Sequence, residues 1–148
     1  MDLILWRHAE AQPGAPDAER RLTAHGTRQA GRMAAWLVRQ LPADTAILVS
    51  PALRAQQTAS ALARRFSTVD ALAPGASLRD VLAASGWPDA RTPVLVVGHQ
   101  PTLGEVAAFL VAGEQAHWPI ATAAFWWLNH HAGATVVNVR AVLGPDLV

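Results

Sequence analysis

Three short apolar runs constrain the fold of this chain more than any other feature. They are Leu3–Trp6, Ala46–Val49 and Val94–Val97, and each is nearly continuous in apolar residues. Runs of this length and composition are typical of strands that are buried on both faces of a sheet. The segments that separate them have helical patterns, so strands alternate with helices along most of the chain, which favours an α/β fold with parallel core strands.

Capping residues and the spacing of apolar residues mark the helices. Thr23, Ser50 and Ser77 each precede a helical pattern as a potential N-cap, and Gly113 can close the last helix. Ala30, Met33, Ala34, Leu37 and Leu41 recur at helical spacing after Thr23. The sequence therefore predicts helices over residues 24–40, 53–65, 77–84 and 102–111.

The C-terminal part of the chain has the pattern of a hairpin. Residues 121–128 and 135–142 are two strand-like segments on either side of the turn-rich joint Asn129–Gly133. With this hairpin, the expected fold is a single α/β domain over residues 1–148. It is a three-layer sandwich with a mostly parallel central sheet, helices on both faces and an antiparallel pair at the end.

Composition excludes several classes of function. The 148 residues include no cysteine, so disulfide frameworks, thiol catalysis and cysteine metal sites are excluded. The longest apolar runs are far shorter than a bilayer span, and the first residues do not resemble a signal peptide, so we expect a cytoplasmic protein with no membrane contact. The net charge is only +1 and the cations are scattered, which argues against a nucleic-acid partner.

Polar residues follow each of the three apolar runs. Arg7-His8 follows the first, Ser50 to Arg54 follows the second, and Gly98-His99 follows the third. In α/β sheets, ligands bind beyond the carboxyl ends of the strands, so these residues should meet at one edge. Two arginines and two histidines there would form a pocket for a dianion such as a phosphoryl group.

Four sequence blocks resemble those of a known family. Leu5-Trp6-Arg7-His8-Ala9-Glu10 resembles the Arg-His signature of the histidine phosphatase superfamily. Leu22-Thr23-Ala24-His25-Gly26 resembles its Leu-Thr-x-x-Gly element, Ser50 to Thr58 its Ser-Pro-x-x-Arg-x-x-x-Thr block, and Val97 to Pro101 its second histidine motif. The short length and residues 19–23 are most similar to phosphohistidine phosphatases of the SixA type.

This resemblance implies a mechanism. His8 would attack phosphorus, Arg7, Arg54 and His99 would bind the three equatorial oxygens, and water would later hydrolyse the phosphohistidine. The physical chemistry agrees, because fixed cations stabilise the transferring group and histidine can be unprotonated at neutral pH. His8 must be neutral and His99 is more useful as a cation, so we expect their pKa values to be pushed apart.

A general acid is not evident in the sequence. Larger members of the superfamily use a carboxylate in the region that here holds only Asp70, Asp80 and Asp89, and none of these matches convincingly. A missing acid typically costs roughly 10²–10⁴-fold in rate for a poor leaving group. Phosphohistidine has a nitrogen leaving group that protonates easily, so the gap favours phosphohistidine, or another labile phosphate, over an unactivated sugar phosphate. We expect the substrate to be phosphohistidine in proteins. Glu10 is a second candidate acid.

The remaining polar residues have structural interpretations. Arg20 can reach the phosphate as a tentative substrate-binding residue, although loop cations are usually solvated. Thr23 and Ser50 are expected to be helix N-caps. Structural roles are also expected for His25 and His117, a solvated turn for His130-His131, and core packing for Trp126-Trp127, with one ring on each face of a strand. No metal and no cofactor are expected.

Other functions stay open at this point. A broad small-molecule phosphomonoesterase or a mutase would use the same four pocket residues, although a mutase needs more basic groups and an acid. A phosphate-binding module without turnover is a third possibility, but no glycine-rich phosphate cradle is present and lysine is absent. The physiological phosphorylated partner cannot be named from the sequence.

Overall fold

The computed structural model describes residues 1–148 and contains one six-stranded mixed sheet. The strand order is β3-β2-β4-β1-β5-β6. The first four strands in the chain are parallel to one another, and the last two are antiparallel to their neighbours. The strands are β1 (Asp2–Arg7), β2 (Ala46–Val49), β3 (Ser67–Thr68), β4 (Val94–Gly98), β5 (Phe125–His130) and β6 (Val137–Leu143).

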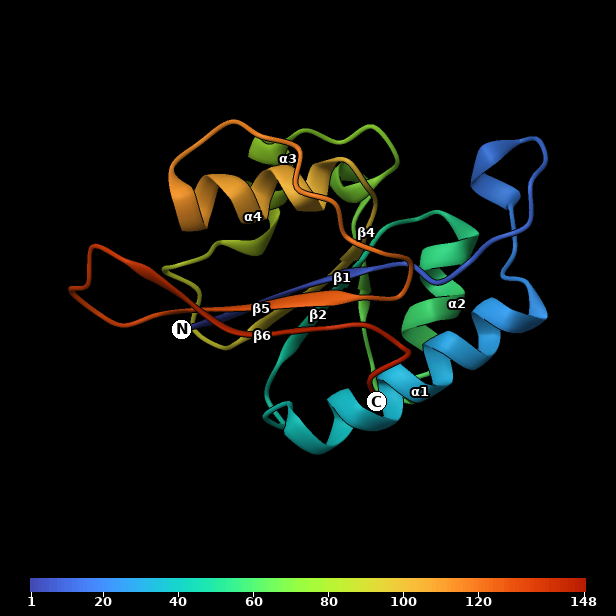
Figure 1. The fold of residues 1–148 in the computed structure, drawn as a ribbon, viewed down its shortest axis with the longest axis horizontal. Helices are drawn as coiled ribbons and strands as arrows, with labels where there is room; N and C mark the ends of the chain where they lie inside the picture. The colour runs from blue at the N-terminus through green and yellow to red at the C-terminus, as the bar shows by residue number, and fades with distance from the viewer.

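Helices cover both faces of the sheet and make it the middle of three layers. Figure 1 shows α3 and α4 above the sheet and α1 below it. The helices are α1 (Ala24–Gln40), α2 (Leu53–Ser60), α3 (Leu78–Ser85) and α4 (Thr102–Ala112), with short 3₁₀ turns η1 (Asp17–Glu19) and η2 (Asp70–Leu72). This arrangement confirms the predicted α/β sandwich with its antiparallel C-terminal pair.

Two hydrophobic cores lie on opposite faces of the sheet, and β1 contributes to both. Ile4 and Trp6 pack with α1 and α2, whereas Leu3 and Leu5 pack with α3 and α4. All four side chains are fully buried. Alternating residues of a strand point to opposite faces, so a strand between two helical layers must be apolar at every position. The continuous apolar runs in the sequence predicted that such strands are buried on both faces.

All four helices begin within one residue of the predicted start, and two of the three predicted N-caps are correct. α1 covers the predicted residues, and the Thr23 side chain accepts a hydrogen bond from the backbone N–H of Gly26. α3 begins with a capping box between Ser77 and Asp80. The prediction that Ser50 caps α2 is wrong, because the N-cap of α2 is Ala52.

Helix α2 is also shorter than predicted, since it ends at Ser60 and not at residue 65. The chain turns at Ala63, which has a positive φ of 51°. The turn brings Leu62 into the core, where only 2% of it is exposed, and Arg64 Nη2 donates to the carbonyls of Pro42 and Ala43. Tertiary contacts therefore end this helix against its local propensity.

The start of β5 differs from the prediction as well. The strand begins at Phe125, four residues later than expected, because the chain turns at Ala123, whose φ is 62°. Trp126 and Trp127 do pack on opposite faces of the sheet, as predicted. Trp126 stacks on Trp118, and Trp127 lies edge-on to Trp36.

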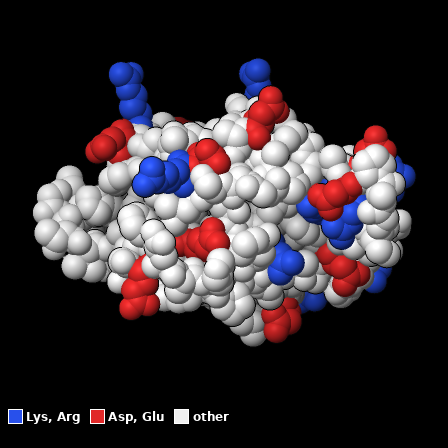
Figure 2. All heavy atoms as spheres, turned by 90° about the horizontal axis from the view of Figure 1, so that it is seen from above, with Lys and Arg blue, Asp and Glu red and all other residues white.

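Two further features concern the apolar character of the helices and the distribution of charge on the surface. None of the helices combines the length and the apolar character that crossing a bilayer requires. Figure 2 shows acidic and basic side chains interspersed over the face that carries α3 and α4.

Candidate active site

The carboxyl ends of β1, β2 and β4 form one edge at which the predicted residues meet. Arg7 on β1 pairs with Gly98 on β4, so these two strands end level with each other. The backbone continues the pairing beyond the strands, because His8 N donates to Gly98 O at 3.1 Å and Ser50 N donates to Val97 O at 3.1 Å. His8, His99 and the start of α2 are therefore neighbours in space.

The contacts of the His8 ring fix which nitrogen carries the hydrogen and which carries the lone pair. Its Nδ1 lies 2.8 Å from the carbonyl oxygen of Ala9, which can only accept, so Nδ1 carries the hydrogen. Nε2 then has the lone pair, and Arg54 Nε donates to it at 3.3 Å. Burial, followed by the charges of Arg54 and Arg7, lowers the pKa of His8 to about 4, although the Ala9 contact opposes this. His8 is therefore neutral at pH 7.

His99 is neutral too, which corrects one expectation from the sequence. Its ring centroid is 5.1 Å from that of His8. Burial lowers the pKa of His99 to about 3, helped by the electrostatic coupling of its titration to that of His8 and by the charge of Arg54. The two pKa values are both lowered and not pushed apart, because both rings are buried beside the same arginines.

A neutral His99 still offers a hydrogen-bond donor to an anion. Its Nε2 lies 2.7 Å from Ser50 Oγ, and this oxygen already accepts from Ala52 N at 3.2 Å. We infer that the Ser50 hydroxyl donates to Nε2, which leaves the hydrogen on Nδ1. Ser50, which is fully buried, thus orients His99.

Arg7 shares an unusual feature with His99. Arg7 Nη1 donates to the carbonyl of Ile120 at 2.7 Å, and burial lowers its pKa. Arg7 Nε and His99 Nδ1 are two of the few buried polar atoms that have no hydrogen-bond partner. Buried polar groups are nearly always paired, so each of these two atoms could form a further hydrogen bond to a ligand oxygen.

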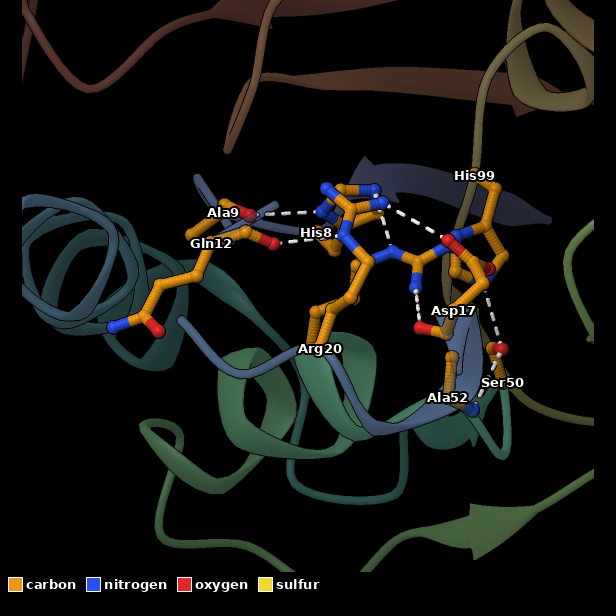
Figure 3. Close-up of polar contacts among 9 residues, drawn as sticks. His8, Ala9, Gln12, Asp17, Arg20, Ser50, Ala52 and His99 are labelled. Atoms are coloured by element: carbon orange, nitrogen blue, oxygen red, sulfur yellow. Dashed lines mark hydrogen bonds and ion pairs between the residues drawn. The ribbon is translucent and has the colours of Figure 1, made fainter. Parts of the chain in front are cut away.

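Asp17 is the pocket residue that sequence reasoning missed. Its backbone oxygen accepts from Arg54 Nη1 at 2.9 Å, and its carboxylate contacts Arg54 Nη2 at 3.1 Å and Arg20 Nη1 at 3.0 Å. Figure 3 shows Asp17 together with Arg20, His8 and His99 in a close-up of these polar contacts. Hydrogen bonds from Arg20 and Arg54 lower the pKa of Asp17, so it is ionised.

Arg20 contacts Asp17 beside the site, and its tentative role in substrate binding stays a prediction. Its Nε donates to the carbonyl of Gln12 at 2.7 Å, and its positive charge contributes to lowering the pKa of His8. Arg20 and Asp17 come from the same loop between β1 and α1. The only sequence signal for Asp17 was its place three residues before Arg20, because the loop's position depends on contacts with α2.

Thr58 is a second residue whose role was not foreseen. It is fully buried in α2, where its hydroxyl donates to the carbonyl of Arg54 at 2.7 Å and accepts from Ala9 N at 3.0 Å. The hydroxyl therefore connects the backbone next to His8 with that of Arg54. This contact gives a physical reason for threonine at the end of the Ser-Pro-x-x-Arg-x-x-x-Thr block.

Glu10 is held away from a simple acid role. Its carboxylate accepts from the hydroxyl of Thr23 at 2.7 Å, and its backbone oxygen accepts from Thr23 N at 3.0 Å. A Cβ at Gly26 would lie 2.0 Å from the Glu10 oxygen, so only glycine allows α1 this close. Glu10 thus fixes the start of α1, and no contact joins it to His8.

The three aspartates of the expected acid region have no contact with the four pocket residues. Asp80 belongs to the capping box of α3, where the Ser77 contacts lower its pKa, and Asp70 begins η2. Asp89 is exposed in the loop after Trp87.

The other histidines lie outside the pocket. His117 Nδ1 is 3.0 Å from Glu105, and His130 Nε2 lies 2.8 Å from the carbonyl of Ala134. His131 and His25 are exposed. The structure has no group of three or more histidine and acidic residues that could hold a metal ion.

This geometry defines a class of protein: an α/β sandwich with a neutral histidine and two arginines around an oxyanion pocket. The model of the histidine phosphatase superfamily, branch 1, matches residues 3–81. The chain belongs to this superfamily of phosphatases.

Individual relatives agree with the family match. The phosphohistidine phosphatase SixA of Escherichia coli is 33% identical over 123 residues, which are 77% of this chain and 76% of that protein. An uncharacterized protein of Mycobacterium tuberculosis is 38% identical over 113 residues, 72% of this chain and 70% of the relative. The structure of the protein histidine phosphatase SixA complexed with tungstate has a TM-score of 0.81 and 26% identity, and the likeness covers 99% of both chains.

Proposed function

We propose that this protein is a phosphohistidine phosphatase that acts on phosphorylated histidine in proteins and forms a phosphoryl intermediate on His8. The observation that carries the proposal is the state of the His8 ring. Nδ1–H is fixed by Ala9 O, Nε2 faces the Arg54 guanidinium, and the pKa of about 4 keeps the ring unprotonated. A nucleophile that is neutral at pH 7 needs no separate base.

The first step transfers the phosphoryl group to His8. The Nε2 lone pair forms a bond to phosphorus, the P–N bond of the substrate breaks, and its electron pair stays on the departing imidazole nitrogen, which takes a proton from water. Arg7, Arg54 and His99 donate to the equatorial oxygens. Donors that are already positioned stabilise the charge of the transition state without reorganisation.

The second step regenerates the enzyme. Water attacks phosphorus, the P–Nε2 bond breaks, and the electron pair returns to Nε2 while the water proton passes to solvent. Inorganic phosphate then leaves, and His8 is again neutral.

The acids of the pocket support a nitrogen leaving group. Asp17 is the carboxylate in contact with the pocket arginines, and these arginines hold it ionised. It therefore has no proton to give to a leaving alkoxide. A departing imidazole is basic enough to take a proton from water, so the proposal fits phosphohistidine better than a sugar phosphate.

Rapid-quench labelling tests the proposal. After mixing with a ³²P-phosphohistidine peptide, the protein should carry an acid-labile, alkali-stable phosphoryl group that is absent in His8→Ala. The same variant should lose at least about 10³-fold in kcat, as is typical when a nucleophile is removed. His117→Ala, which changes an exposed histidine outside the pocket, is the matched control.

Two results would overturn the proposal. Turnover by His8→Ala at the parent rate would rule out the covalent intermediate. Equal kcat/KM for sugar phosphates and for phosphohistidine peptides would rule out the leaving-group argument and favour a broad phosphomonoesterase.

A further inference from the structure

A recess lined mostly by polar residue types lies next to the first half of α1, and none of the four pocket residues lines it. Its volume is about 390 Å³, and only one of its eight lining residues is hydrophobic. Three separate segments form it: the first half of α1, the loop at residues 121–122 and the C-terminal residues 145–146. The lining residues that matter here are His25, Arg28, Gln29, Arg32, Thr122 and Asp146. We call this space the α1 recess.

The α1 recess carries more positive than negative charge. His25, Arg28 and Arg32 follow helical spacing, so they lie along one side of α1. Arg32 donates to the backbone oxygen of Val148 through Nε and Nη2, whereas Arg28 and His25 have no hydrogen bond or ion pair. Asp146 is the one carboxylate in the lining, against two arginines.

Gln29 adds a neutral donor. Its Oε1 accepts from the backbone N–H of Glu10 at 3.0 Å, so the orientation of the side-chain amide is fixed. The amide nitrogen has no protein partner, and Gln29 lines the recess. A charged guanidinium and a fixed amide next to each other suit the two oxygens of a carboxylate or of a phosphate.

The recess and the catalytic pocket share a wall. Residues 121 and 122 lie between Ile120, whose carbonyl accepts from Arg7 Nη1, and Ala123, whose N–H donates to His8 O at 3.1 Å. On the other side, Gln29 holds the backbone two residues beyond His8. These contacts link the lining of the recess on two sides to the backbone around His8.

We propose that the α1 recess binds a second anionic group, a carboxylate or a phosphate, of the same substrate whose phosphoryl group is transferred to His8. The proposal rests on the proposed function of that site and adds a determinant of specificity. On a protein substrate, the group would be an aspartate or glutamate side chain near the phosphohistidine. On a small substrate, it would be a carboxylate or second phosphate of the same molecule.

The proposal can be tested with a pair of matched peptides and a pair of matched arginine variants. Two phosphohistidine peptides differ only in flanking glutamates or glutamines, and the parent is compared with Arg28→Gln. The variant should raise KM for the glutamate peptide by about three- to tenfold, the usual range for a partly exposed charged contact, with kcat unchanged. KM for the glutamine peptide should not change.

Arg39→Gln is the control, because Arg39 is exposed on the same helix, lies outside the recess and has the same charge. If it has the same effect as Arg28→Gln, the cause is overall charge and the proposal is wrong. The proposal is also wrong if Arg28→Gln changes KM equally for both peptides.

Two small inhibitors distinguish the source of the anionic group. Phosphoglycolate and ethyl phosphate share a phosphate, but only phosphoglycolate has a carboxylate. If the small molecule is the source, phosphoglycolate binds more tightly in calorimetry and loses this advantage in Arg28→Gln. If only the glutamate peptide responds, the group belongs to a protein. If neither responds, the recess has no such role.

The two proposals fail in different ways. Hydrolysis of the glutamine peptide by the parent tests the proposed function by itself. If that peptide is hydrolysed and the Arg28 effects are absent, only the recess proposal fails. If it is not hydrolysed, the proposed function fails, while calorimetry with the two inhibitors still reports on the recess.

Discussion

The parallel and antiparallel parts of the sheet contribute to the candidate site in different ways. The parallel strands β1, β2 and β4 lead into side chains of the candidate site: His8, Ser50 and His99. The antiparallel side contributes backbone atoms, because Ile120 O accepts from Arg7 and Ala123 N donates to His8 O. The candidate site therefore depends on side-chain identity at the parallel strands and on backbone conformation at the antiparallel side.

The largest expected effect is at Arg54, the side chain that connects the parallel edge with the loop above it. On the proposed mechanism, Arg54→Ala removes a donor to the transferring phosphoryl group, and it also removes the contacts of Arg54 with His8 and Asp17. Loss of one such donor typically costs about 10²–10³-fold in kcat. Arg54→Lys should recover only part of the rate, since an ammonium cannot donate to His8 and Asp17 in the same fork geometry.

Arg64→Ala serves as the control, because Arg64 lies just after the same helix and contacts only the carbonyls of Pro42 and Ala43. Steady-state kinetics with a phosphohistidine peptide measure the comparison. If Arg54→Ala and Arg64→Ala lowered kcat equally, the side chains at the edge of the parallel strands would have no special role in catalysis.

The fold was predictable where local pattern and burial agree. The three apolar runs predicted β1, β2 and β4 because both faces of these strands are covered. The prediction of α1 was also right, since Thr23 and Pro42 mark its limits within the sequence itself. At the end of α2 and at Ala123, the backbone turns where the sequence continues a regular pattern. Contacts that are distant in sequence decide such turns.

The convergence of the site residues was predictable where they follow a strand directly or lie in the first turn of the helix that comes after it. His8 and His99 were placed correctly because the register of parallel strands fixes where they end. Asp17 lies in a proline- and glycine-rich loop, and nothing local indicates that this loop reaches α2. The pKa of His99 was wrongly predicted, because the prediction weighed its role toward a phosphate and not its burial beside two arginines.

A smaller effect should appear in stability as a function of pH. The folded pKa is about 4 for His8 and about 3 for His99, both below the unfolded value. Between pH 7 and pH 5 the unfolded chain therefore binds protons that the folded chain does not, and the free energy of unfolding falls. His8 alone should account for about 2 kcal/mol of this loss, from the difference between pKa values near 4 and 6.5.

Urea unfolding at pH 7 and pH 5 measures this loss, and the parent is compared with His8→Gln. Between pH 7 and pH 5, the free energy of unfolding of the variant should fall by about 2 kcal/mol less than that of the parent. The same loss in both proteins would show that His8 is not held neutral by the fold.

The smallest effect is expected at the far end of the antiparallel pair, where the sequence has two adjacent histidines. His130 lies at the end of β5 opposite to the site and contacts the carbonyl of Ala134 and the edge of Trp87. His131 is exposed. Since neither contributes a backbone atom to the pocket, His131→Ala should leave kcat/KM unchanged, and His130→Ala should cost only about 1 kcal/mol of stability for the lost hydrogen bond.

Adding Zn²⁺ tests whether His130 and His131 bind a metal ion. Neighbouring residues of an extended chain point to opposite faces, and no third ligand lies nearby. The melting temperature of the parent should therefore respond to micromolar Zn²⁺ no more than that of the double variant His130→Ala/His131→Ala. A stabilisation by Zn²⁺ that the double variant loses would show that the antiparallel part contributes side-chain chemistry after all, and the contrast between the two parts of the sheet would fail there.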